Sequence, residues 1–186
     1  MKGWAVWLTG LPGCGKSTVA RILAESLIER DIPVQILSLD MLRKVITPRP
    51  TYSDEERKIV YGALVFATRL LTENGVNVLI DATANRRRYR AEARRQISLF
   101  IEAYLKCPLE VCIDREAKRR RTHGAPRHIY SKGMVGRSKN VPGLGAPYEE
   151  PSNPEVTVET GELNSKQSAE KILTTIKKRF KLDIDL

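Results

Sequence analysis

The stretch Gly10-Leu11-Pro12-Gly13-Cys14-Gly15-Lys16-Ser17-Thr18 decides the fold of this chain. It fits the pattern G-x-x-x-x-G-K-[ST] and lies between an apolar run at residues 4–8 and a segment of helical periodicity. Strand, loop and helix in this order are the context of a phosphate-binding loop. Glycines let several backbone N–H groups point at one polyphosphate, and the following helix adds the positive end of its dipole. The nine residues are therefore predicted to bind a nucleoside triphosphate.

Two side chains of this loop have predicted chemical roles. Lys16 is expected to reach the outer phosphates, and the Ser17 hydroxyl to complete a Mg²⁺ shell that otherwise consists of water and phosphate oxygens. Phosphoryl transfer also needs a carboxylate; Asp40 follows the second predicted strand and Asp81 ends the third. Because parallel strands end at one edge of a sheet, both acids are expected beside the loop. Either one is a candidate base.

Length and composition favour one domain over residues 1–186. A hydrophobic content of 41% and a charged content of 29% argue against global disorder. The formal net charge of +10 favours anionic partners: nucleotides, sulfated or phosphorylated metabolites, nucleic acid or acidic membranes. Three cysteines without zinc-site spacing, and the lack of a long apolar run or a leader, predict a reduced cytoplasmic protein without a membrane span.

Apolar strand-like runs alternate with helical patterns along the chain. This alternation predicts an α/β fold of three layers, with a five-stranded, mainly parallel sheet between helices. The strands are expected at residues 4–9, 34–39, 76–81, 100–105 and 156–159. Between about residues 116 and 151 the periodicity disappears, while Gly, Pro, Lys and Arg accumulate. Long irregular stretches often move or bind something, so we expect a mobile lid there.

Apolar residues at helical spacing mark the expected core faces of two helices. They are Val19, Ala20, Leu23 and Leu27 after the phosphate loop, and Ile59, Ala63, Leu64, Ala67, Leu70 and Leu71 in the second helix. Ser53 and Glu56 have the spacing of a capping box before the second helix, and Asn164 is expected to cap the last one.

Four segments in chain order resemble the adenylylsulfate kinase family. They are WLTGLPGCGKST at residues 7–18, YSDEER at 52–57, PLEVC at 108–112, and GLGAPYE at 143–149 with the prolines that follow. Many NTPases share the first segment, whereas the last is more selective. The resemblance covers nearly the whole chain and implies an α/β P-loop kinase. It further implies transfer of the γ-phosphate of ATP to the 3′-hydroxyl of adenosine 5′-phosphosulfate (APS), giving 3′-phosphoadenosine 5′-phosphosulfate and ADP.

The resemblance also implies roles for single residues. Asp40 matches the family acid that acts as general base toward the 3′-hydroxyl and lies near Mg²⁺. The expected APS-binding residues are Arg43, Tyr52, Arg57, Thr83 and Lys139, with Tyr52 stacking on the adenine. Arg115 is expected to face the adenine of ATP, as arginines near the lid do in similar kinases. The family also implies a homodimer.

Several departures from the family pattern concern the acceptor. They are Ser38-Leu39-Asp40 for Asp-Gly-Asp, Val60 for an asparagine, Val141 for a lid phenylalanine and Gly145 for an acid. The segment at residues 81–86 also resembles the Asp-Ala-Thr-Asn pattern of other small P-loop kinases. These departures leave open a kinase for another sugar, nucleotide or polynucleotide hydroxyl.

Basic residues gather at residues 86–95 and 118–121. Runs of like charge are often solvated helix faces, and we adopt this interpretation, so nucleic acid is not an expected partner. The alternative is an ATP-dependent regulator that binds RNA or DNA, with an affinity that falls steeply with salt.

Overall fold

The computed structural model describes residues 2–119, 122, 124–136, 138 and 140–183. Within this part of the chain, a sheet of five strands occupies the centre of the molecule. Its order is β2 (Val34–Ser38), β3 (Asn77–Asp81), β1 (Ala5–Thr9), β4 (Phe100–Lys106) and β5 (Val156–Glu159), with every pairing parallel. The predicted α/β class and strands are confirmed, and each strand boundary differs from its prediction by at most one residue.

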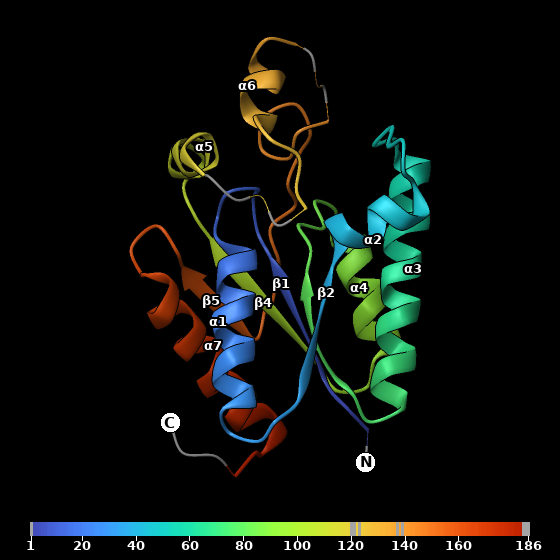
Figure 1. Cartoon of the computed structure of the whole chain (residues 1–186), viewed down its shortest axis with the longest axis vertical. Coiled ribbons are helices and arrows are strands. Elements are labelled where there is room, and N and C mark those ends of the chain that lie inside the picture. Colours follow the sequence, from blue (N-terminus) through green and yellow to red (C-terminus); the bar gives the residue numbers. More distant parts are fainter. Residues whose placement is uncertain (1, 120–121, 123, 137, 139, 184–186) are drawn as a thin grey trace.

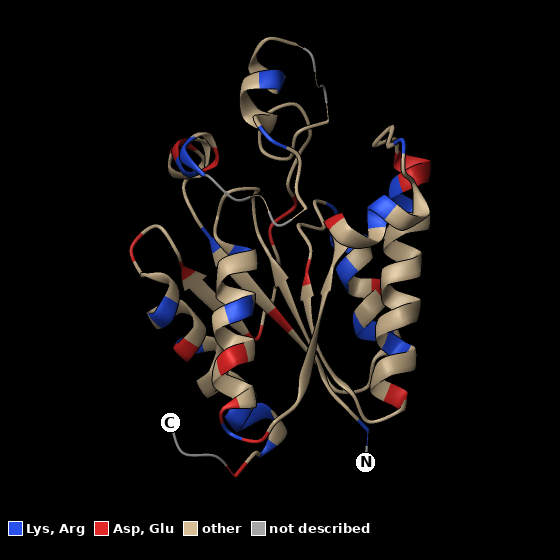
Figure 2. Cartoon of the chain, in the orientation of Figure 1, with Lys and Arg blue, Asp and Glu red and all other residues tan. Residues whose placement is uncertain are grey.

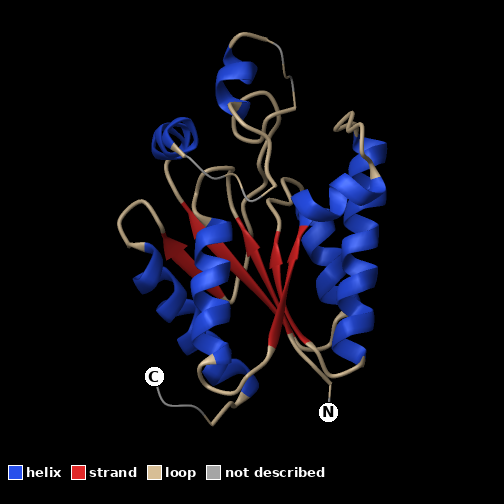
Figure 3. Ribbon diagram, in the orientation of Figure 1, coloured by secondary structure: helices blue, strands red, loops and turns tan. Residues whose placement is uncertain are grey.

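Helices cover both faces of this sheet (Figures 1 and 3). The helices α1 (Lys16–Ile28) and α7 (Ser165–Phe180) lie on one face, and α3 (Asp54–Glu73) and α4 (Arg87–Gln96) lie on the other. The short α2 (Leu39–Ile46), α5 (Leu109–Lys118) and α6 (Ile129–Met134) lie toward the carboxyl ends of the strands. Since all strands run in the same direction, the loops that follow them meet at that edge.

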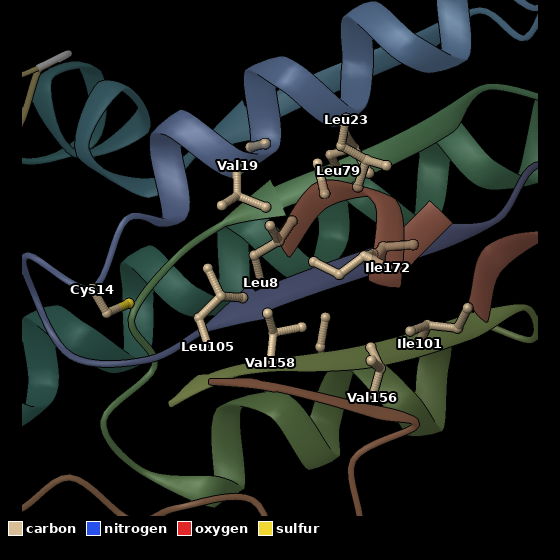
Figure 4. Close-up of a cluster of buried hydrophobic side chains, with 14 of the residues drawn as sticks. Leu8, Cys14, Val19, Leu23, Leu79, Ile101, Leu105, Val156, Val158 and Ile172 are labelled. Carbon is tan, nitrogen blue, oxygen red and sulfur yellow. The ribbon is translucent and has the colours of Figure 1, made fainter. Parts of the chain in front are cut away.

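The core on the α1 side confirms the first predicted helix face. Figure 4 shows Leu8 and Leu105 of the sheet beneath Val19 and Leu23 of α1, with Ile172 of α7 beside them. Each of these side chains is at most 1% exposed. Burial of a large aliphatic side chain contributes about 1.5–3 kcal/mol, so this layer holds the phosphate loop's helix firmly on the sheet.

The predicted core face of α3 is wrong for two of its residues. Ile59 and Leu70 are 61% and 41% exposed, while the helix buries Val60, Tyr61 and Leu64 against the sheet. Apolar residues occur on both sides of α3, so spacing alone does not decide which side faces inward. The contact with β3 and α4 decides it.

The helix caps follow the sequence expectation with one difference. Ser53 Oγ accepts a hydrogen bond from the backbone N of Glu56 at 3.2 Å, as predicted. The Glu56 carboxylate, however, bonds to Arg43 and Thr51 instead of closing a capping box. Asn164 caps α7, and there the box is complete: Gln167 Oε1 accepts from the Asn164 backbone N at 3.0 Å.

Replacing Asn164 by alanine is expected to lower the free energy of unfolding by about 1 kcal/mol. The asparagine side chain accepts from the backbone N of Lys166 and of Gln167, both at 3.0 Å, and alanine leaves these donors without that partner. Urea denaturation followed by circular dichroism measures the change. Asn164→Ser serves as the control, because serine is also a good cap. Equal midpoints for the alanine variant and the wild type would contradict the prediction.

The basic cluster at residues 86–95 is a solvated face only in part: Arg87, Arg88, Arg94 and Arg95 are exposed, as expected, but Arg90 is not. Arg90 is 1% exposed, and its Nε lies 2.5 Å from Glu102 Oε1. Arg86 and Arg94 pair with Glu149 and Glu155 at 2.9 and 2.6 Å. Figure 2 shows acidic and basic residues interspersed along α1 and α3 as well. Arg86, Arg90 and Arg94 therefore connect α4 and the residue before it to β4 and to residues 149–155.

The segment at residues 116–151 is less irregular than the sequence suggested. It contains α6 and a bridge between Pro142 and Ala146, next to residues that the structure does not describe. Arg119 pairs with Glu116 in this segment at 3.2 Å. Among the described residues, no helix is both long and apolar enough to span a membrane.

Candidate nucleotide and acceptor site

The phosphate loop joins β1 to α1, and its backbone requires glycine. Gly13 has a φ of +86°, and a Cβ at this position would lie 2.4 Å from the carbonyl oxygen of Cys112. Gly15 is the N-cap of α1 with a φ of +102°, in the left-handed region that side chains rarely adopt. The first N–H groups of α1 therefore remain available to an anion.

Lys16 begins α1 and is 8% exposed. Its Nζ donates to the backbone oxygens of Gly10 and Leu11 at 3.0 and 2.9 Å, so the ammonium lies within the curled loop. Cys14 Sγ is 3.7 Å from the same nitrogen. Burial raises the pKa of the Cys14 thiol, which keeps it neutral and favours a packing role over a reactive one.

One cavity of 650 Å³ brings the predicted residues together. Those that line it are Pro12, Gly13, Cys14, Gly15, Lys16, Ser17, Thr18, Asp40, Arg43, Tyr52, Arg57, Thr83 and Arg115. Gly10 and Leu11 belong to the same loop but not to the cavity lining, and Lys139 lies outside the described residues. The cavity thus extends from the phosphate loop to the predicted acceptor residues.

Two carboxylates line this cavity, Asp81 at the end of β3 and Asp40 in the first turn of α2. Ser38 of β2 pairs with Asp81 of β3, so Asp40 and Asp81 emerge at adjacent strand ends. Burial raises the pKa of Asp40, and the charge of Asp81 raises it further, against the opposing effect of Lys16. A carboxylate with a raised pKa accepts a proton more readily, which suits a general base.

The oxygen atoms at this edge fit a magnesium ion. Ser17, Asp40 and Asp81 all line the cavity, and Mg²⁺ prefers oxygen ligands while keeping several waters. In the described part of the chain, no group of three or more His, Cys, Asp or Glu residues could hold a metal alone.

Arg43 and Tyr52 are held together by Glu56. Arg43 is 6% exposed and ion-paired with Glu56, and its guanidinium lies over the Tyr52 ring, 4.8 Å from the centroid. Glu56 Oε2 also accepts from the Tyr52 backbone N at 2.9 Å. Although burial opposes it, hydrogen bonds from Thr51 lower the pKa of Glu56, so it remains charged. Sequence reasoning assigned Glu56 only to a cap and missed this role.

Arg57 has three partners from separate segments. Its Nε donates to the Tyr52 backbone oxygen at 3.1 Å, and its Nη2 to the Asn140 backbone oxygen at 2.8 Å. Its Nη1 donates to Asn85 Oδ1 at 2.7 Å. Sequence reasoning did not assign Asn85 or Asn140 to the site. The Asp-Ala-Thr-Asn-like segment after β3 was the only signal for Asn85.

Segments far apart in the sequence meet above the phosphate loop. Tyr130 of α6 donates its hydroxyl to the Pro12 backbone oxygen at 2.8 Å. Tyr148 Oη lies 2.9 Å from Thr9 Oγ1, which in turn donates to the Thr83 backbone oxygen at 2.6 Å. The Pro-Tyr-Glu segment is thereby tied to β1 and to the turn after β3.

Val60 and Val141, two departures from the family pattern, do not share the same surroundings. Val60 is fully buried in the core between the sheet and α3, and it is absent from the cavity lining. Val141 lines the cavity and is 4% exposed. Arg115 is exposed at the cavity's other end, where its Nη2 donates to the Thr160 backbone oxygen at 2.8 Å.

A parallel α/β sheet, a phosphate loop with its lysine, and acidic and basic groups gathered in one cavity define a P-loop kinase. Comparison with known proteins narrows this class. The family model described as "Adenylylsulphate kinase" matches residues 2–159. The chain belongs to the adenylylsulphate kinase family, and it is an ATP-dependent kinase, as the sequence predicted.

Relatives with this family's name are similar to the chain over nearly its full length. A "Probable adenylyl-sulfate kinase" of Pyrococcus abyssi is 35% identical over 177 residues, which are 95% of this chain and 97% of the relative. An "Adenylyl-sulfate kinase" of Gloeothece citriformis is 37% identical over 172 residues, 92% of this chain and 93% of the relative. The Mycobacterium tuberculosis APS kinase CysC, solved with AMPPNP and APS, superposes with a TM-score of 0.84 at 27% identity, covering 95% and 98% of the two chains.

Proposed function

We propose that this chain transfers the γ-phosphoryl group of ATP to the 3′-hydroxyl of APS, giving 3′-phosphoadenosine 5′-phosphosulfate and ADP. The observation that carries the proposal is the single 650 Å³ cavity, which joins Lys16, Asp40, Arg43 and Arg57. It contains both a donor end and an acceptor end, as a kinase for two nucleotides requires. The CysC structure, with its ATP analogue and APS, supports the same arrangement.

The donor end binds the nucleotide through the loop at residues 10–18. Its N–H groups and Lys16 neutralise the β- and γ-phosphates, and Arg115 lies at the adenine. Ser17 and Asp40 would hold Mg²⁺, which would neutralise charge on the phosphates. Each of these groups stabilises negative charge that moves during transfer, and such fixed groups contribute most of the catalysis.

The acceptor end orients the ribose and removes one proton. Arg43 and Arg57 hold the phosphosulfate, Tyr52 stacks on the adenine, and Thr83 and Lys139 complete the site. The Asp40 carboxylate takes the proton of the 3′-hydroxyl. The 3′-oxygen then bonds to the γ-phosphorus while the bond from that phosphorus to the β,γ-bridging oxygen breaks, and ADP leaves.

The segment at residues 116–151 acts as the lid of this single domain. Tyr130 and Asn140 connect it to the phosphate loop and to Arg57, so both ends of the cavity contact it. Closure over both nucleotides would exclude water that competes for the phosphoryl group. We infer a homodimer in a reducing cytoplasm from the family resemblance and from the free, buried cysteines.

A coupled assay of ADP release tests the reaction. The wild type should release one ADP per APS consumed and should show only slow release without APS. Shikimate, gluconate, adenosine and a 5′-hydroxyl oligonucleotide are the comparison acceptors. Faster release with any of these than with APS would redirect the proposal to another hydroxyl, and retention on nucleic acid without turnover would refute it.

Replacing Tyr52 by alanine is expected to raise the KM for APS about tenfold. A base stacked on an aromatic ring contributes about 1–3 kcal/mol, and Val141, which also lines the cavity, has no aromatic ring to stack on the base. Initial rates at varied APS and saturating ATP measure the effect. Tyr52→Phe retains the ring and should behave like the wild type. An unchanged KM in the alanine variant would place the adenine elsewhere.

A further inference from the structure

Asn85 is a buried polar residue of the cavity to which neither the motifs nor the family resemblance assigns a role. It lies in the turn after β3, is 2% exposed and lines the cavity. Its Oδ1 accepts from Arg57 Nη1 at 2.7 Å, and its Nδ2 donates to the Pro147 backbone oxygen at 3.2 Å. Its own backbone oxygen accepts from the Glu149 N at 2.8 Å. One residue therefore connects α3, this turn and the Pro-Tyr-Glu segment.

The turn that carries Asn85 is fixed by its surroundings. Ala84 has a φ of +45°, a left-handed conformation that costs a non-glycine residue about 1–3 kcal/mol and persists only where neighbouring groups enforce it. The Ala84 N–H donates to Tyr61 Oη at 2.8 Å, and the Ala84 carbonyl accepts from Arg90. The Asn85 amide is consequently presented at a defined angle.

Arg90 supports this turn from the opposite side. It extends from α4, which packs beside α3 (Figure 1), and its Nη2 donates to the Glu149 backbone oxygen at 2.6 Å. Its charge is balanced by Glu102, which is 8% exposed on β4. Arg90 therefore holds the turn after β3 and the Pro-Tyr-Glu segment, which Asn85 also connects.

The contacts of Arg57 leave a defined number of donors for a ligand. A guanidinium has five N–H donors. Within the described part of the chain, Arg57 directs three of them at Tyr52, Asn85 and Asn140. The remaining two suffice for a forked contact with one sulfate or phosphate group. With its orientation fixed before binding, the long side chain loses less rotamer freedom when the anion arrives.

We propose that Asn85 is a positioning residue that fixes the Arg57 guanidinium so that two N–H groups face the phosphosulfate of the acceptor. The inference rests on the proposed function, because it takes Arg57 as an APS ligand. The family pattern has an asparagine at position 60 of α3, where this chain has a valine that is buried in the core. In this chain Asn85, in the turn after β3, places a side-chain amide beside Arg57 instead.

Asn85→Leu tests the proposal, since leucine has a similar size and no hydrogen-bonding group. The KM for APS is expected to rise about tenfold, from the loss of a hydrogen bond to a charged group, while the KM for ATP changes less than twofold. Arg57→Ala should raise the KM for APS at least as much. The double variant should be no worse than Arg57→Ala, because the two residues act through one contact.

Asn77 provides the matched control at the other end of β3. Its Nδ2 donates to the Pro33 backbone oxygen at 3.0 Å, and its Oδ1 accepts from the Trp4 backbone N at 3.3 Å. Asn77→Leu should lower the melting temperature and leave both KM values unchanged. Asn85→Asp keeps the acceptor for Arg57 and loses the donor to Pro147, so its KM for APS should stay within about threefold of the wild type.

The outcomes separate this inference from the proposed function. A wild type without APS-dependent ADP release would overturn both. If the wild type is active, three results would overturn the inference alone. Asn85→Leu could keep the wild-type KM for APS, it could raise the KM values for APS and ATP equally, or its effect could add to that of Arg57→Ala. Should Asn85→Leu fail to fold, Asn85→Ala, which also lacks a hydrogen-bonding side chain, is measured in its place with the same expected result.

Discussion

Replacing Lys16 by methionine is expected to lower kcat/KM for the kinase reaction by about 10³-fold. Removing one fixed donor from a developing negative charge typically lowers the rate by about 10²–10³-fold, and here a full positive charge is lost in a nearly buried position. Lys16 is 8% exposed, and methionine preserves most of its volume while removing the ammonium. The coupled ADP assay measures the loss.

The control for this variant is Lys171→Met, which removes an exposed lysine of α7 that does not line the cavity. It should retain full activity. Melting curves of both variants should stay close to the wild type, because the bonds of Lys16 to described residues are all within its own loop, to the Gly10 and Leu11 oxygens and the Cys14 thiol. A Lys16→Met enzyme with more than a tenth of wild-type kcat/KM would show that the phosphoryl group moves elsewhere.

Replacing Asp40 by asparagine is expected to lower kcat by about 10²–10³-fold, in the range of a lost general base. The pH profile gives a sharper test. Burial and the neighbouring Asp81 raise the pKa of Asp40, so wild-type kcat/KM should fall on the acid side at a pH above the ordinary range of an aspartate. This acid limb should disappear from the residual activity of the variant.

The thermal stability of Asp40→Asn should rise, although its activity falls. Because the pKa of Asp40 is higher in the folded than in the unfolded state, the free energy of unfolding decreases as pH rises from the ordinary value of 3.8 through the raised value. At neutral pH the charged carboxylate therefore destabilises the fold. Asp40→Asn should melt at a higher temperature than the wild type in metal-free buffer. The control is Asp114→Asn, which changes an exposed acid of α5 and should keep full activity. Loss of activity together with a lower melting temperature would indicate misfolding and contradict the assignment.

The sequence by itself determined the sheet, the phosphate loop and the position of two acids, Asp40 and Asp81, at the ends of neighbouring strands. These features depend on spacing along the chain: the alternation of strands and helices, glycines where the loop turns back, and an acid directly after a strand. The order of parallel strands then places Asp40 beside Lys16 without further information. The family resemblance rested on the same short segments.

Only the tertiary structure decided which partners the arginines have. Glu56 had the spacing of a cap but neutralises Arg43, and Arg90 belonged to an apparently solvated cluster but is buried against Glu102. Asn85 meets Arg57 across 28 positions of sequence. Contacts of this kind depend on how α3 and α4 rotate and pack on the sheet, and side-chain periodicity leaves that rotation undetermined when a helix is apolar on more than one side.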